Sequence, residues 1–70
     1  MDSRRLTLKV EGRDINVPRV KYVQAKCKQL REFGYTNLTE KEVDSQIDCI
    51  LQKKPLDVIG KFMEDEVISE

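Results

Sequence analysis

The side chains best suited to covalent or metal chemistry in this chain are its two cysteines, Cys27 and Cys49. A thiolate can act as a nucleophile or bind zinc, but a zinc site needs several close ligands and the chain contains no histidine. The two cysteines also lie too far apart for a Cys-x-x-Cys motif. We therefore expect no metal site, and we expect Cys27 to be an inert core thiol in a protein of the reducing cytoplasm.

Pairs of carboxylates are the other candidates for chemistry, because two neighbouring acids can share acid and base roles. Asp44 with Asp48 and Glu64 with Glu66 stand at short spacings. We expect them on solvent-facing sides of helices, where a carboxylate stays an ordinary acid. The three glycines are isolated and lack the spacing of a phosphate-binding loop. The sequence thus predicts that the protein is not an enzyme and has no cofactor or small-molecule ligand.

Charge is unevenly distributed along the chain, although the net charge is zero. Residues 1–33 hold nine basic and four acidic residues, and residues 34–70 hold four and nine. Such asymmetry can provide a basic surface for nucleic-acid phosphates, or it can be neutralised when the two halves pack. The candidate phosphate contacts are Arg4, Arg5, Lys9, Arg13, Lys21, Lys28 and Arg31. A small nucleic-acid-binding regulator is therefore the alternative function, which the zero net charge disfavours.

A helix-turn-helix is one form that this alternative could take. The usual motif has a core aliphatic residue six positions after its turn glycine. Counting from Gly34, that position is Glu40, and the first aliphatic residue of the next helix is Val43. That helix would also turn Asp44 toward the DNA phosphates. The spacing therefore argues against the usual motif.

An aromatic stripe is the candidate surface for a protein partner. Tyr22, Lys26, Gln29 and Phe33 recur at helical spacing, and Tyr35 follows shortly after. One interpretation is that a central helix buries this second face against the hairpin or the third helix. The other is that Tyr22, Lys26, Phe33 and Tyr35 contact a partner, since aromatic residues concentrate binding energy.

Residues 6–17 alternate apolar and polar side chains around Gly12, which is the pattern of a half-buried β-hairpin. A type II′ turn at Gly12–Arg13 would place Val10 opposite Ile15. A four-residue loop would keep the same pairing. A two-stranded hairpin is marginal alone, so we expect it to pack on the helices with both of its edges open.

Three amphipathic segments follow the hairpin, each marked by a start or stop signal. Pro18 suits a first helical turn, Gly34 a helix end, and Thr39 to Glu42 form a capping box. Their predicted buried residues are Val20, Val23, Cys27 and Leu30, then Val43, Ile47, Ile50 and Leu51, then Val58, Ile59, Phe62 and Met63. The predicted elements are a hairpin over residues 5–17 and helices over residues 18–33, 39–54 and 56–66. Val67 and Ile68 do not fit the last helix, so we expect the tail to pack elsewhere.

The 70 residues are therefore expected to form a single small α+β domain, an N-terminal hairpin packed on three helices. No segment has the apolar length of a signal peptide or a membrane span. A thin core and an open strand edge favour homodimerisation by strand pairing. The sequence predicts a non-catalytic protein-interaction module whose partner is another protein or a second copy.

Overall fold

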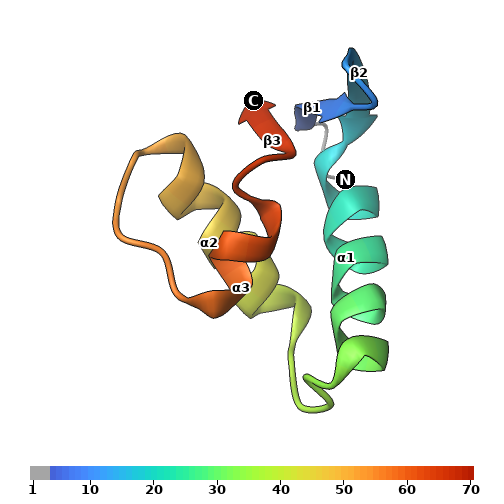
Figure 1. Ribbon diagram of the computed structural model, residues 1–70, viewed down its shortest axis with the longest axis vertical. Helices are drawn as coiled ribbons and strands as arrows, with labels where there is room; N and C mark the ends of the chain where they lie inside the picture. Colours follow the sequence, from blue (N-terminus) through green and yellow to red (C-terminus); the bar gives the residue numbers. More distant parts are fainter. Residues whose placement is uncertain (1–3) are drawn as a thin grey trace.

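The computed structural model describes residues 4–70, and the first three residues of the predicted domain lie outside them. Along the chain the elements are β1 (Arg5–Val10), β2 (Arg13–Pro18), α1 (Arg19–Phe33), α2 (Glu40–Leu51), α3 (Val58–Met63) and β3 (Val67–Ser69). The strands form an antiparallel sheet of order β2-β1-β3 at one end of α1, and α2 and α3 lie beside that helix (Figure 1). The predicted α+β domain with an N-terminal hairpin and three helices is confirmed, with one strand more than expected.

The hairpin has a two-residue turn at Glu11–Gly12 rather than at Gly12–Arg13. Both turn residues have positive φ, 52° and 79°, as a type I′ turn requires. The register is therefore shifted by two residues from the predicted one: Ile15 lies opposite Leu8, and Val10 lies opposite Arg13. This register also sets Lys9 against Asp14, an opposite-charge pair.

β3 covers the free edge of β1, so the expectation that both hairpin edges stay open is wrong. Val67 pairs with Leu8 and Ser69 with Thr7, on either side of a register shift. The N–H of Lys9 also donates to the Glu66 carbonyl at 2.8 Å. The chain tail leaves the last helix to build the sheet.

α1 starts and ends close to its predicted bounds. Pro18 is the N-cap in extended conformation, and β2 runs into the helix without a loop. Gly34 follows the last helical residue with φ of 139°. The N–H groups of Gly34 and Tyr35 donate to the carbonyls of Arg31 and Leu30 at 3.2 and 3.0 Å, the bond pattern of a Schellman motif.

α2 begins as the capping box predicts but ends three residues before the predicted position 54. The Thr39 hydroxyl accepts from the Glu42 N–H at 3.2 Å. After Leu51 the chain turns through Lys53, whose φ is 57°, and the N–H of Lys54 donates to the Cys49 carbonyl at 2.9 Å. Lys53 therefore takes the left-handed conformation that a glycine usually adopts after a helix. Because no glycine marks this position, the sequence pattern did not reveal where α2 ends.

α3 is six residues long, instead of the predicted eleven. Asp57 caps it by accepting from the N–H groups of Ile59 and Gly60 at 2.9 and 3.1 Å. A Cβ at Gly60 would lie 2.5 Å from the Gln46 Oε1 atom and 3.0 Å from the Leu56 Cβ atom. The glycine therefore lets this side of α3 approach its neighbours closely.

The core is aliphatic apart from one tyrosine and one cysteine, and it joins the sheet to all three helices. Its members are Leu6, Leu8, Tyr22, Val23, Cys27, Leu30, Leu38, Val43, Ile47, Ile59, Met63 and Val67. Three residues predicted to be buried are exposed: Val20 by 41%, Val58 by 53% and Phe62 by 39%. For α3 the cause is Gly60, because the face with Ile59, Gly60 and Met63 turns inward and the opposite face turns outward. Within residues 4–70, no helix is long and apolar enough to cross a membrane.

Candidate functional site

Three aromatic rings from separate parts of the chain meet on the surface at one end of the molecule. Phe33 ends α1, Tyr35 lies in the loop that follows it, and Phe62 lies on α3. The Phe62 ring is edge-on to Phe33 and Tyr35, with centroids 5.5 and 5.7 Å apart, and Phe33 and Tyr35 are stacked at 6.4 Å. Together with the exposed Val58 they form what we call the aromatic surface: Phe33, Tyr35, Val58 and Phe62. Phe33 is its most exposed member, at 70%.

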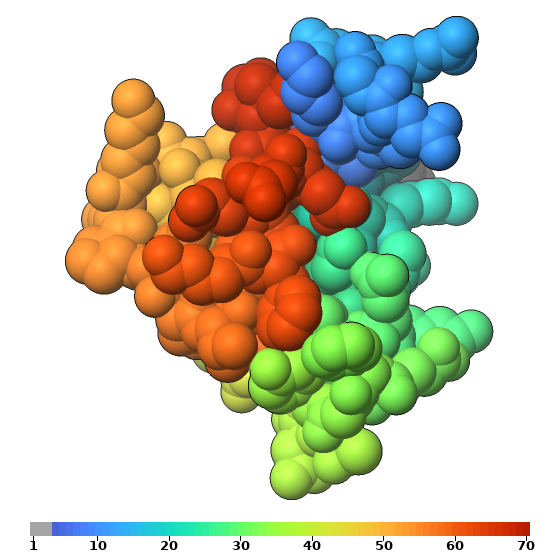
Figure 2. Space-filling model, in the orientation of Figure 1, coloured from blue at the N-terminus to red at the C-terminus, as the bar shows by residue number. Residues whose placement is uncertain are grey.

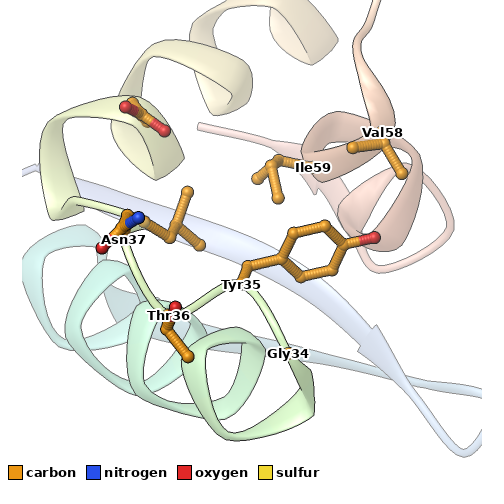
Figure 3. Close-up of a pocket in the computed structure, with 8 residues that line it drawn as sticks. Gly34, Tyr35, Thr36, Asn37, Val58 and Ile59 are labelled. Atoms are coloured by element: carbon orange, nitrogen blue, oxygen red, sulfur yellow. The ribbon is translucent and has the colours of Figure 1, made fainter.

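Hollows lie on two sides of these rings. The first, of about 350 Å³, lies between the loop after α1 and the start of α3, where the Tyr35 ring extends beneath Ile59 and Val58 (Figure 3). The second, of about 210 Å³, lies between α1 and α3. It is lined by Lys26, Gln29, Leu30, Phe33 and Phe62. The surface therefore combines protruding rings with hollows whose walls are partly apolar and partly polar.

Local sequence signals place each ring. Gly34 ends α1 directly after Phe33 and turns the chain back at Tyr35, whose N–H donates to the Leu30 carbonyl. The N–H of Leu38 then donates to the Tyr35 carbonyl at 3.0 Å, which closes the loop. The Asp57 cap and the inward face at Gly60 fix the orientation of α3 and so direct Phe62 outward.

The predicted partner stripe is divided by the fold. Tyr22 is buried and its hydroxyl donates to Glu66 at 2.7 Å. Lys26 forms an ion pair with Glu66 at 2.8 Å, donates to Gln29 at 2.9 Å and lies 5.6 Å from the Tyr22 ring centre. The structure therefore holds Tyr22 and Lys26 in internal contacts, leaves Phe33 exposed and packs the half-buried Tyr35 against the core.

These contacts shift the pKa values of Tyr22 and Glu66. Burial, the hydrogen bond to Glu66 and the charge of that carboxylate raise the pKa of Tyr22. Burial acts to raise the pKa of Glu66, but the contacts from Lys26 and Tyr22 and the positive charge of Lys26 lower it overall. Tyr22 is therefore neutral and Glu66 charged near neutral pH, so the pair joins α1 to the turn before β3 without supplying a reactive group.

Arg19 is the functional-looking residue that sequence reasoning did not single out. Its side chain is 1% exposed, and it bonds Asp44 at 2.8 Å and Asp48 and Glu70 at 2.7 Å each. It also donates to the Asp44 carbonyl at 3.1 Å. Burial disfavours the charged guanidinium, but the hydrogen bonds to the three carboxylates more than offset this, so the pKa of Arg19 is raised.

The expectation that Asp44 and Asp48 only line a solvent face is therefore wrong. They are half-buried and hold an arginine from the basic half of the chain. Because every polar atom of this arginine that is buried has a partner, the cluster is a structural contact between α1, α2 and the tail.

The seven candidate phosphate contacts are all exposed, but they do not face one way. From the strand register, Arg5 and Lys9 lie on one face of the hairpin and Arg13 on the other. Arg5 also bonds the Asn16 side chain, and Arg31 donates to the Leu38 carbonyl at 2.6 Å. Figure 2 shows side chains of the hairpin and of α1 projecting from the side that faces away from α2 and α3.

Among residues 4–70, no group of three or more histidine, cysteine or acidic side chains could hold a metal ion. Cys27 is buried, and its sulfur lies 3.6 Å from the Leu38 carbonyl oxygen. Cys49 is half-buried and also free.

Comparisons with protein-family models, curated proteins and solved structures find no match to this chain.

Proposed function

We propose that the protein is a non-catalytic protein-interaction module that binds its partner through the aromatic surface. The observation that carries this proposal is the exposure of Phe33 within a cluster of three contacting rings. Contact between aromatic rings and water is unfavourable. A partner that covers the rings removes this contact and so lowers the free energy.

The size of the surface supports the proposal. A phenylalanine carries ~150–250 Å² of surface, so an exposed fraction of 70% leaves roughly 100–170 Å² of Phe33 in water. With Tyr35, Val58 and Phe62 the apolar area is on the order of 300 Å², the size at which the largest patch of a monomer is often functional. The other large apolar side chains exposed in residues 4–70 are aliphatic: Val10, Ile15, Val20 and Ile68.

The test is a comparison of proteins captured by three immobilised forms: the wild type, Phe33→Ala and Val20→Ala. Val20 is a matched control because it is an exposed apolar residue of the same helix, outside the aromatic surface. The proposal predicts a set of host proteins that the wild type and Val20→Ala retain and Phe33→Ala loses. Equal capture by all three would contradict it.

Since Cys27 and Cys49 are both free, we further propose the reducing cytoplasm as the place of action.

Nucleic-acid binding is the second candidate function, favoured by one observation. Seven basic side chains of the described N-terminal half are exposed to solvent. Retention on a duplex-DNA column that falls steeply with salt would support this candidate. Passage through the column at low salt would reject it.

A further inference from the structure

We propose that the aromatic surface binds a second copy of this chain about a two-fold axis. The exposed Phe33 ring of each copy enters the hollow between α1 and α3 of the other. This inference rests on the proposed protein-interaction function and names its partner.

The shape of the aromatic surface suits a two-fold interface, which must be complementary to itself. The aromatic surface meets this demand, since the protruding Phe33 ring also forms one wall of the hollow, so an incoming Phe33 ring would pack against its counterpart. A cavity of ~150 Å³ lined by apolar side chains can take up a benzene ring, and the hollow between α1 and α3 measures about 210 Å³. Leu30 and Phe62 supply apolar walls for an incoming ring.

The charges near the aromatic surface must also allow two copies to meet, because a two-fold axis brings identical charges close together. The net charge of the chain is zero, so two copies do not repel each other as wholes. Lys26, which also lines the hollow, is paired with Glu66 at 2.8 Å. On α3, Lys61 lies 3.9 Å from Glu64. The charged residue that lines the hollow is therefore already neutralised by a carboxylate of the same chain.

The strand edge is a poorer route to the same dimer. In a hairpin with a two-residue turn the flanking pair is hydrogen-bonded, so in β2 only Asp14 and Asn16 direct their backbone groups outward before Pro18, which has no N–H. Arg5 already bonds the side chain of Asn16 and approaches its carbonyl oxygen at 3.4 Å. A second β2 strand would find few groups to pair with.

The aromatic surface is small for an interface between two copies. Stable interfaces bury ~800 Å² per partner, and the aromatic surface supplies less than half of this. The dimer is therefore of the small, weak class, with dissociation in the micromolar to millimolar range. The 8.2 kDa chain is then monomeric when dilute and dimeric when concentrated.

The test uses Phe33→Trp, because the chain contains no tryptophan and the new indole is its only one. The matched control is Val20→Trp, at another exposed position of α1. Sedimentation equilibrium from micromolar to millimolar concentration is run with emission spectra of the same samples. We expect the mass to rise toward two chains while the emission shifts to shorter wavelength at position 33 and stays unchanged at position 20.

The second variant, Phe33→Ala, measures how much the ring contributes. A central aromatic residue commonly contributes ~30-fold to affinity. Because two rings are lost from the dimer, its dissociation constant is expected to rise about a thousandfold. A strictly monomeric wild type, or a dimer that Phe33→Ala leaves unchanged, overturns the inference. If the wild type is monomeric but Phe33→Ala still loses captured host proteins, self-association fails while the proposed function stands.

Discussion

Arg19 shows how a single residue can determine where several segments meet. It follows Pro18 and occupies the first turn of α1, where its side chain points into the protein. One guanidinium provides enough donors to bond three carboxylates, which lie on α2 and in the tail after β3. Sequence reasoning counted this arginine as one of nine basic residues. The periodicity of charged residues does not tell which one faces inward when a strand runs directly into a helix.

We predict that Arg19→Met lowers the free energy of unfolding by about 2 kcal/mol, measured by urea denaturation. Removing a buried cation usually costs more, ~3–5 kcal/mol. Here the three carboxylates are 36%, 48% and 42% exposed, so water can solvate them once the arginine is gone.

The matched control for this change is Arg13→Met, at the exposed tip of the hairpin. It should change the unfolding free energy by no more than about 0.5 kcal/mol. Equal effects of the two substitutions would show that the Arg19 cluster contributes no specific stability.

Among the elements, those with strong local signals were predictable. The alternation around Gly12 gave the hairpin, and Thr39 to Glu42 gave the start of α2. β3 was not predictable as a strand, because three residues form a strand only when a neighbour supplies the hydrogen bonds. The register also depended on the turn type. That type requires Glu11 to adopt a left-handed conformation, which a glutamate does not signal in the sequence. The mismatch of Val67 with the last helix was the available sign that the tail packs elsewhere.

The contribution of β3 can be measured at two neighbouring positions. Val67 is 5% exposed and lies opposite Leu8, whereas Ile68 is 47% exposed. We predict that Val67→Ala lowers the free energy of unfolding by about 2 kcal/mol, because it removes buried methyl groups and leaves a cavity. Ile68→Ala should cost about 0.5 kcal/mol. If thermal or urea unfolding finds the two variants equally stable, β3 does not contribute to the core as described.

Across the whole molecule, the opposite charges of the two chain halves are partly paired by folding. Arg19 and Lys26 bond Asp44, Asp48, Glu66 and Glu70 of the acidic half. The sequence left open whether the packing of the two halves neutralises these charges, and the structure buries one of the paired cations, Arg19. The exposed basic residues that remain are divided between two faces of the hairpin and α1, so they do not make one compact site.

The candidate site was predictable only in part. Phe33 and Tyr35 were among the candidate partner contacts, because aromatic residues concentrate binding energy. Phe62 was wrongly assigned to the core. In a six-residue helix the periodicity cannot show which face is buried, and here the face that contains Gly60 packs inward. Tyr22 and Lys26 fell on the same stripe, but Glu66 arrives from the tail to hold both. Contacts between segments distant in sequence decided these assignments.

The aromatic surface as a protein-binding site is tested most directly by photo-crosslinking in host cells. A photoreactive phenylalanine analogue placed at position 33 keeps the natural aromatic group and reacts only with what touches it. The same analogue at position 20, on an exposed part of the same helix, is the control. We predict covalent adducts with a protein, a second copy included, from position 33 and few or none from position 20. Equal yields from both positions, or none from position 33, would contradict the proposed function.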